Sequence, residues 1–390
     1  MPVTQRMQKV MAAHQPLLDF VTRSEWAHRG NDKDVFDFTF GNPQQMPIPG
    51  FAEALQKWVP PHNKDWYAYK LSEAETRQCI AESLTRWRKV PFEAEDVAVT
   101  SGAFGAIATA FATFLDPGDE VVYSLPPWFA YEPMLLHAGA VCVKVPVKQG
   151  DFDLDLDAIE RALSPRTRMV IVNSPNNPTG KIYSPETLAA LGRMLSDASD
   201  KFGRPVYLLS DEPYSRLVFA GRPFFSPTDY YPYSMISYSY GKVLLTPGQR
   251  IGFLALPPAN PERLERREQI MTAQIAGGWL FPNALLQHAI RDLDALSIDL
   301  AELEVKRDLM VAGLRDAGYE VHKPDGTFYL LPRSPIADDL AFAKVLARQD
   351  IFVMPGAICS IPGHFRITLT ASRERLQQSL AGFRKARAEA

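Results

Sequence analysis

Short apolar segments alternate with helical segments over the middle of the chain, from about residue 97 to residue 256. Apolar runs without polar alternation are typical of strands buried on both faces. Such strands, alternating with helices, predict an α/β fold with a mostly parallel, seven-stranded sheet covered by helices on both faces. A short connection separates the last two strands, so we expect the seventh to enter antiparallel. The expected strands are 97–100, 120–124, 140–147, 169–173, 206–210, 235–238 and 251–256.

Helical patterns fill the connections and both flanks of this region. Ser72 followed by Glu75 has the pattern of a capping box, which predicts a helix that begins at Ser72. A long helix is expected over 283–296. The other expected helices are 51–58, 104–115, 131–137, 154–162, 185–201, 263–274 and 301–317.

The two ends of the chain differ from the middle in their expected secondary structure. The segment 35–40 alternates between apolar and polar residues, as an edge strand does. After about residue 285 the expected strands are short, 328–331 and 366–369, which indicates a smaller α+β unit. Because 390 residues are too many for one small core, we expect two subdomains, built from three segments of the chain. They are an N-terminal arm with part of the small domain (1–46), a large domain (47–285) and a C-terminal small domain (286–390).

Composition and charge narrow the class of function. With 46% hydrophobic residues, the chain can bury a substantial interior. The formal net charge of -3 and the lack of a basic run argue against nucleic-acid binding. The longest apolar segment, 103–115, is too short to span a bilayer, and the N-terminus lacks the apolar stretch of a signal peptide. The three cysteines are far apart and the histidines lack metal-ligand spacing, so we expect reduced thiols, no metal and a cytoplasmic protein.

Polar and aromatic residues follow several of the expected strands directly. In an open parallel sheet, ligands bind outside the carboxyl ends of the strands. Lysine is the side chain that forms an imine with a carbonyl, and Lys242 follows the expected strand 235–238. Together these strand ends offer a helix N-terminus, an aromatic ring, a carboxylate, a phenol and an imine-forming lysine. They are 101–103, Trp128, 173–180, 211–214, Ser239 and Lys242.

Four motifs, in this order, resemble those of the class I/II pyridoxal-phosphate-dependent aminotransferases, enzymes of fold type I that are similar to aspartate aminotransferase. They are Asn-Asn-Pro-Thr-Gly (176–180), Ser-Asp-Glu-Pro-Tyr (210–214), Ser-x-x-Lys followed by Gly-x-Arg-x-Gly (239–252) and Phe-Arg-Ile-Thr-Leu (365–369). The resemblance extends from Gly41 to the last expected strand. It implies pyridoxal 5′-phosphate as cofactor, and transfer of the amino group of an L-α-amino acid to a 2-oxo acid by a ping-pong mechanism.

The resemblance also implies a role for each matching residue. Lys242 would hold the cofactor as an imine and then act as general base and acid. Asp211 would pair with the protonated ring nitrogen, and Asn177 and Tyr214 would donate to the ring oxygen. Trp128 would stack on the ring, although a plain core tryptophan is an alternative. The residues implied to bind the phosphate are Ser101, Gly102, Ala103, Ser239 and Arg250.

Two further roles concern the substrate and a second subunit. Arg366 resembles the residue that binds the substrate α-carboxylate in a bidentate fork, and Gly41 and Asn177 are expected beside it. Tyr67 resembles the residue that reaches the phosphate of a neighbouring subunit, which implies a homodimer with sites at the interface. Packing within its own aromatic cluster is the alternative for Tyr67.

Three positions depart from the family pattern. Gly241 precedes the lysine where a small hydroxyl residue is usual, and Ser72 stands where glycine is usual. Phe104 replaces a lysine that one aspartate-type branch uses for a distal carboxylate, so an uncharged substrate side chain, aromatic or aliphatic, is expected. The same machinery would also serve a lyase, a cyclising synthase or an amino-acid oxidase. A regulatory domain that binds the cofactor without catalysis is a further alternative, but no DNA-binding segment precedes Gly41.

Overall fold

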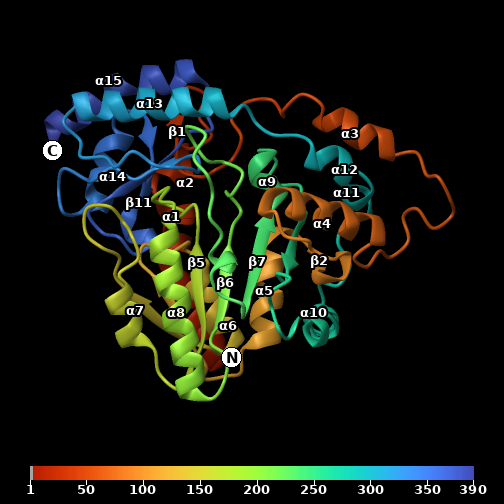
Figure 1. Cartoon of the computed structure of the whole chain (residues 1–390). Coiled ribbons are helices and arrows are strands. Elements are labelled where there is room, and N and C mark those ends of the chain that lie inside the picture. Colours follow the sequence, from red (N-terminus) through yellow and green to blue (C-terminus); the bar gives the residue numbers. More distant parts are fainter. Residues whose placement is uncertain (1–2) are drawn as a thin grey trace.

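The computed structural model of the protein describes residues 3–390 and contains one large sheet and two small ones (Figure 1). The large sheet has seven strands in the order β2-β8-β7-β6-β5-β3-β4. Every neighbouring pair is parallel except the two that involve β8. The prediction of a mostly parallel sheet with an antiparallel last strand is therefore confirmed. The strands are β2 (Val97–Thr100), β3 (Glu120–Ser124), β4 (Val141–Val145), β5 (Thr167–Asn173), β6 (Tyr207–Asp211), β7 (Ser234–Ser239) and β8 (Gly252–Ala255).

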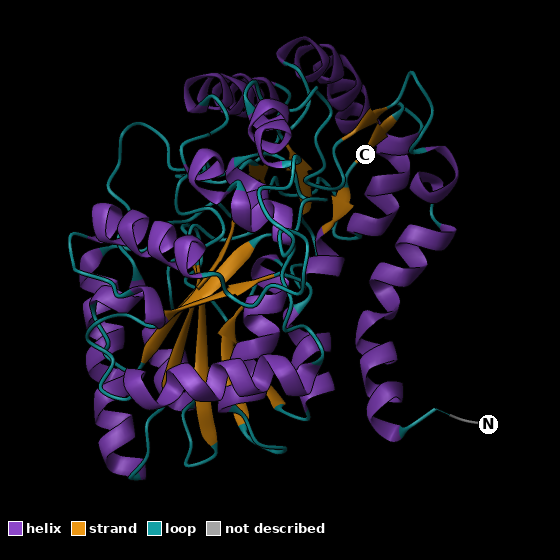
Figure 2. Ribbon diagram, turned by 90° about the vertical axis from the view of Figure 1, so that its right-hand side faces the viewer, coloured by secondary structure: helices purple, strands orange, loops and turns teal. Residues whose placement is uncertain are grey.

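Helices cover both faces of this sheet because successive strand residues point to opposite sides. Val121 and Tyr123 pack in one apolar cluster, whereas Val122 packs in another on the opposite face. Figure 2 shows helices on both sides of the strands. The first face carries α5 (Gly102–Phe114), α6 (Tyr131–Ala138) and α10 (Arg263–Gly277). The second carries α7 (Leu156–Ala162), α8 (Pro185–Phe202) and α4 (Ala74–Arg88).

The two ends of the chain meet in a smaller unit. Strand β1 (Phe36–Asp37) pairs in parallel with β10 (Ile351–Phe352), so the red β1 lies among the blue C-terminal elements in Figure 1. A second small sheet is antiparallel, in the order β11-β12-β9. Its strands are β9 (Tyr329–Leu330), β11 (Met354–Pro355) and β12 (Phe365–Thr368). The helices of this unit are α13 (Leu300–Asp316), α14 (Asp339–Ala347) and α15 (Arg373–Glu389).

The remaining elements are helices outside the two layers. Helix α1 packs against α6. No helix among residues 3–390 is both long enough and apolar enough to cross a membrane. These helices are α1 (Gln5–Arg23), α2 (Glu25–Arg29), α3 (Phe51–Trp58), α9 (Tyr240–Val243), α11 (Ala284–His288) and α12 (Ile290–Asp294), with 3-10 turns at Ala94–Asp96, Pro227–Asp229 and Gly356–Cys359.

Two local predictions are wrong. Helix α4 begins at Ala74 with Glu73 as its N-cap residue, and no side chain caps it. The Ser72 hydroxyl instead accepts a hydrogen bond from the Val99 amide at 2.9 Å, so it binds the edge of the large sheet. The expected helix 283–296 is broken at Ala289 into α11 and α12. His288 lies at this break, where it stacks on the Trp66 ring with 3.7 Å between centroids.

Candidate active site

A cavity of about 310 Å³ lies at the carboxyl ends of strands β5, β6 and β7. It is therefore at the edge of the sheet where ligands of parallel α/β folds bind. Most of the residues predicted from the strand ends come together here. The lining residues are Ala103, Phe104, Trp128, Asn173, Asn177, Asp211, Pro213, Tyr214, Ser239, Lys242, Pro247 and Arg250.

Lys242 enters the cavity from α9, the short helix that follows β7. The sequence predicted a position at the end of the strand, and the structure places the lysine within this first helical turn. Its Nζ lies 5.7 Å from the ring centroid of Tyr214 and 5.9 Å from that of Phe328. The ammonium group thus lies near two aromatic rings, both from residues that are buried.

Asp211 is the last residue of β6 and only 2% exposed. Its Oδ2 accepts a hydrogen bond from the Tyr131 hydroxyl at 2.5 Å and a long one from the Asn173 amide at 3.4 Å. Its Oδ1 is buried and has no hydrogen-bond partner among the described residues. Burial raises the pKa of Asp211 to about 6, and the nearby hydroxyls of Tyr131 and Ser237 and the charge of Lys242 oppose this rise.

Two asparagines connect the end of β5 to the small unit. The Asn173 side-chain oxygen accepts a hydrogen bond from the Asn177 amide at 2.7 Å. The Asn177 oxygen in turn accepts one from Arg366 Nη1 at 3.1 Å. Arg366 Nη2 donates to the Thr39 carbonyl at 3.0 Å, and its Nε is buried without a partner in residues 3–390. The guanidinium lies 4.3 Å from the ring centroid of Tyr329.

Arg250 lines the cavity, and Gly102, at the start of α5, lies against its guanidinium group. Gly102 has a φ of 73°, and a Cβ there would meet the Arg250 guanidinium. Arg250 donates to the carbonyl oxygens of Pro247 at 2.8 Å and Ser101 at 3.3 Å. Ser101 is the N-cap residue of α5 and Ser239 that of α9, and neither hydroxyl caps its helix. Both hydroxyls and the first amides of α5 are thus available to an anion, which helix N-termini attract.

Aromatic side chains form the wall of the cavity. Phe104 packs edge-to-face on Trp128, with 4.5 Å between ring centroids, and is 48% exposed at the cavity mouth. Trp128 also meets Tyr131 edge-to-face at 5.4 Å. Tyr214 is buried, and burial raises the pKa of its hydroxyl well above the ordinary value, with Tyr329 contributing. This phenol therefore stays protonated and can donate a hydrogen bond.

Five predicted residues lie outside the cavity lining: Ser101, Gly102 and Arg366, which contact lining residues as described above, and Tyr67 and Gly41. Tyr67 is 54% exposed, and its hydroxyl donates to the Val59 carbonyl of its own chain. Gly41 lies against Phe328 and Tyr329, so that a Cβ at this position would meet both rings. Gly41 is thus close to the aromatic residues beside Lys242 and Arg366.

The sequence analysis did not assign Tyr131 and Asn173 to the Asp211 carboxylate. Asn173 could have been found, because it ends β5 in register with Asp211 at the end of β6. Tyr131 lies 80 residues away in the chain, and no local pattern indicates its contact with Asp211.

Comparisons with known proteins agree with this geometry. Residues 33–383 match the family model described as aminotransferase class I and II. A probable aspartate/prephenate aminotransferase from Thermus aquaticus is 31% identical over 361 residues, which cover 90% of this chain and 91% of that protein. A crystal structure of an amino transferase from Eubacterium rectale has a TM-score of 0.90 and 30% identity, over 100% of this chain and 99% of that one. The aspartate aminotransferase from Thermus thermophilus with maleate has a TM-score of 0.84 and 26% identity, over 99% and 100% of the two chains.

The seven-stranded sheet, the smaller α+β unit and the cavity with its lysine define an enzyme of the aspartate aminotransferase-like fold, fold type I. The chain belongs to the class I and II aminotransferase family, and its activity is that of an aminotransferase. The resemblance drawn from the four motifs is therefore confirmed.

Proposed function

We propose that the cavity binds pyridoxal 5′-phosphate and transfers the amino group of an L-α-amino acid to a 2-oxo acid in two half-reactions. The observation that carries this proposal is the Asp211 carboxylate, which is buried although one of its oxygens has no partner among the described residues. Such a group is costly unless a ligand completes its hydrogen bonds. A protonated ring nitrogen would supply both the missing hydrogen bond and the opposite charge. The residues therefore fit this cofactor.

Each residue around the ring of the cofactor would have a different role. When bound, pyridoxal 5′-phosphate supplies a ring that withdraws electrons from the substrate Cα. Lys242 would hold it covalently through Nζ and, once the substrate has displaced it, would take the proton from the substrate Cα and deliver it to the cofactor carbon that bears the imine. Tyr214 and Asn177 would donate to the ring hydroxyl oxygen. The Asn177 side-chain carbonyl already accepts a hydrogen bond from Arg366, so its NH2 group is the part that would donate. Trp128 would cover one face of the ring.

The end of the cavity at the start of α5 would hold the phosphate. Arg250 offers a charged donor there, and Ser101 and Ser239 offer hydroxyls. The amides of Gly102 and Ala103 begin the helix, whose N-terminal dipole favours an anion. The absence of a side chain at Gly102 leaves room for this contact.

Arg366 and the aromatic wall would select the substrate. The buried Nε of Arg366 has no partner within residues 3–390, so a substrate α-carboxylate beside Gly41 and Asn177 would complete its bonds. The basic residues in the cavity lining are Lys242 and Arg250. Both already have a proposed role toward the cofactor, so neither is left to pair with a charged substrate side chain. Since Phe104 and Trp128 occupy the mouth, we propose a substrate with an uncharged, aromatic or aliphatic side chain.

A homodimer with sites at the subunit interface is part of the proposal. Tyr67 lies outside the cavity of its own chain, and half of its surface is exposed. A residue that contacts the phosphate site of a partner subunit would have this position. The neighbouring Tyr69 is 86% exposed, and such exposure of large aromatic residues is typical of interfaces.

The domain division and the compartment also remain proposals. The pairing of β1 with β10 supports counting residues 1–46 with the C-terminal small domain 286–390, beside a large domain over 47–285. The three cysteines are all free thiols, which supports a reducing, cytoplasmic location.

An absorbance titration tests the function. The purified protein with added cofactor should have a visible band, which suitable amino acids bleach and a 2-oxo acid restores. The Lys242→Ala variant should lack the band of the lysine-bound cofactor. No visible band in the wild-type protein would sink the roles given to Lys242 and Asp211. Release of ammonia or peroxide, without an aminated acceptor, would favour the lyase or oxidase alternatives.

The substrate proposal has its own test. The kcat/KM for phenylalanine should exceed that for aspartate, and Phe104→Lys should shift the ratio toward aspartate by about tenfold, because a cation then faces the distal carboxylate. An unchanged ratio would contradict selection by Phe104 without affecting the aminotransferase activity.

A further inference from the structure

A second, larger cleft of about 1420 Å³ lies between the large sheet and the small unit. One wall is the hairpin 147–154, which connects β4 to α7 and is closed by the antiparallel bridge between Val147 and Leu154. The other wall comes from the segments around β9 and β12 and from α15. Within residues 3–390, this cleft shares no lining residue with the cavity that contains Lys242.

The charges around this cleft are unbalanced. Its four arginine and lysine side chains face one carboxylate, Glu320, and that carboxylate pairs with Arg333 at 3.2 Å. Arg315 donates instead to the Val321 carbonyl at 2.9 Å, and Arg387 to the Gly318 carbonyl at 3.4 Å. No carboxylate among the described residues pairs with these two guanidinium groups, and with Lys148 they make the cleft attractive to an anion.

The floor of the cleft is apolar and carries one unsatisfied polar atom. Val147, Ile336 and Ile361 line it, and the ring of Phe152 meets His322 edge-to-face with 5.8 Å between centroids. Burial lowers the pKa of His322, so the imidazole is neutral at neutral pH. Its Nε2 is buried without a hydrogen-bond partner among the described residues. An apolar floor with few convergent polar groups is typical of sites for small molecules.

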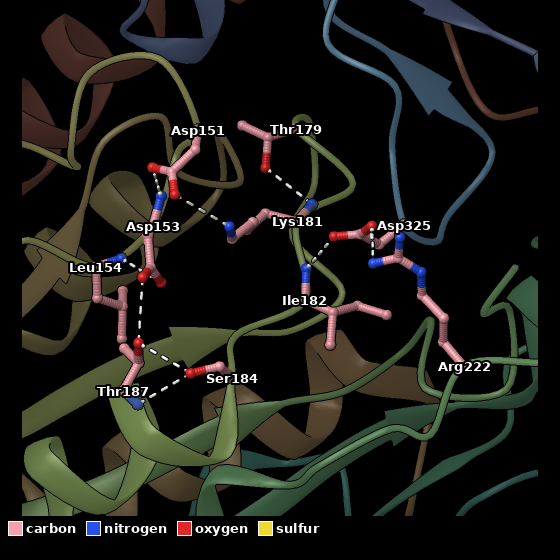
Figure 3. Close-up of polar contacts among 10 residues, drawn as sticks. All are labelled: Asp151, Asp153, Leu154, Thr179, Lys181, Ile182, Ser184, Thr187, Arg222 and Asp325. Atoms are coloured by element: carbon pink, nitrogen blue, oxygen red, sulfur yellow. Dashed lines mark hydrogen bonds and ion pairs between the residues drawn. The ribbon is translucent and has the colours of Figure 1, made fainter.

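The hairpin holds Phe152 in place from both sides. Phe152 has a φ of 59°, in the left-handed region that is costly for a bulky residue. Asp151 before it pairs with Lys181 at 3.4 Å, and Asp153 after it accepts a hydrogen bond from the Thr187 hydroxyl at 3.1 Å (Figure 3). The loop is therefore fixed to the segment 180–187 rather than free in solution.

The opposite wall is fixed to the same segment. Asp325 pairs with Arg222 at 2.7 Å and accepts a weak hydrogen bond from the Ile182 amide at 3.5 Å, as Figure 3 shows. The amides of Asp325 and Gly326 both donate to the Gly180 carbonyl, at 3.0 and 3.1 Å. Because both walls are tied to one segment, the cleft is already formed in the absence of a ligand.

We propose that this cleft is a second binding site, for a small molecule with one anionic group on an aromatic or aliphatic body. The anionic group would lie among Lys148, Arg315 and Arg387, and the body would pack on Phe152 and the apolar floor. A ligand there touches both units, so its affinity depends on their relative orientation. This site does not depend on the function proposed above.

The dye 8-anilinonaphthalene-1-sulfonate has this chemistry and is the probe for a fluorescence titration of the full-length, cofactor-loaded protein. Lys148→Glu and Arg387→Glu should each weaken its binding by about tenfold, because each replaces an attraction by a repulsion in a partly desolvated cleft. Lys385→Glu is the matched control. It makes the same charge change on α15 at an exposed position outside the cleft, and should leave the affinity unchanged.

Equal affinities for the wild type, Lys148→Glu and Arg387→Glu would overturn the proposal, as would an equal loss in Lys385→Glu. Circular dichroism and thermal melting confirm that each variant is folded. Phe104→Ala alters the mouth of the other cavity and should not change dye binding, so a loss there would place the dye in the active site and also overturn the proposal. Displacement of the dye by 1-naphthoate but not by inorganic sulfate is expected, and displacement by sulfate alone would refute the need for an apolar body.

Discussion

Asp211 and Glu212 are adjacent buried carboxylates at the end of β6, and their surroundings differ completely. Glu212 pairs with Arg88 and accepts hydrogen bonds from the hydroxyls of Ser210, at 2.7 Å, and Ser226. Asp211 has the Tyr131 hydroxyl on one oxygen and no partner within residues 3–390 on the other. The chain thus satisfies one carboxylate fully and leaves its neighbour incomplete.

The difference separates a structural charge from one that serves a ligand. A buried ion pair with all its hydrogen bonds made needs nothing from outside, and removing one partner leaves the other charge uncompensated. A buried carboxylate with an open oxygen carries a cost that a bound group can remove. Burial raises the pKa of Asp211 to about 6, as expected for a carboxylate that lacks a full set of partners. Burial also lowers the pKa of Arg88, the partner of Glu212, to about 10. At this pKa the guanidinium group is still charged at neutral pH.

The largest expected effect is on catalysis, at a residue that lines the same cavity as Asp211. Lys242→Ala should reduce the rate of transamination by about a thousandfold or more, because the general base and acid is lost. Its effect on the free energy of unfolding of the cofactor-free protein should be small. Steady-state kinetics and urea denaturation measure the two quantities. A variant that keeps most of its activity would contradict the role of this lysine.

On the structural side, Glu212→Gln should lower the free energy of unfolding of the cofactor-free protein by about 3–5 kcal/mol, because Arg88 then keeps a buried, unpaired charge. Urea denaturation at pH 7 measures this change. A loss below about 1 kcal/mol would mean that water reaches Arg88, and the contrast between the two carboxylates would fail.

Substitution of Asp211 should change the free energy of unfolding in the opposite direction to substitution of Glu212. Asp211→Asn should raise the free energy of unfolding of the cofactor-free protein at pH 7 by up to about 3 kcal/mol, since it removes a charge whose pKa lies near 6 instead of 3.8. Cofactor binding should weaken in the same variant. If Asp211→Asn were as destabilising as Glu212→Gln, Asp211 would be a structural charge as well.

The pH dependence checks the cause of this gain. Between about pH 4 and pH 6, Asp211 is protonated in the folded state but ionised in the unfolded state. The folded state then binds more protons, so the contribution of Asp211 to stability falls as the pH rises through this window. The difference between wild type and Asp211→Asn should therefore vanish near pH 4. A difference that persists there would show another cause.

The smallest expected effect concerns the phosphate end of the cavity. Gly102→Ala should weaken cofactor binding by about tenfold, because the new Cβ meets Arg250 and the φ of 73° disfavours alanine. Gly203→Ala is the matched control, with a φ of 67° and open space around the position of its Cβ. It should carry a similar backbone cost in stability and leave cofactor affinity unchanged. Equal cofactor affinities in the two variants would refute the contact with Arg250.

Much of the fold was predictable because the apolar strands carry their signal locally. The antiparallel direction of the last strand followed from the short connection before it, and the strand ends indicated where the cavity lies. The start of α4 was not predictable from Ser72 and Glu75, because the Ser72 hydroxyl accepts a hydrogen bond from the Val99 amide, 27 residues later, and no local pattern indicates that contact. The break at Ala289 likewise accompanies a contact between His288 and Trp66, 222 residues apart.

The candidate site was predictable in its parts and less so in its connections. The motifs predicted Lys242, Asp211 and Arg250 as site residues, and all three line one cavity. That Asp211 bonds to Tyr131 depends on how α6 packs over the sheet, and no spacing in the sequence encodes it. The second cleft could not be foreseen either, since its two walls come from segments on either side of β5 to β8 in the chain.

The position of β2 at the edge of the sheet has a consequence for biosynthesis. Its partner in the sheet is β8, about 150 residues later in the chain. The first turn of α5 follows β2 directly, and Arg250 comes from the segment just before β8. During translation, this end of the cavity stays incomplete until residue 255 has left the ribosome, because the chain emerges from its N-terminus. A phosphate group that binds at this end, as proposed above, would therefore be acquired late in the making of each molecule.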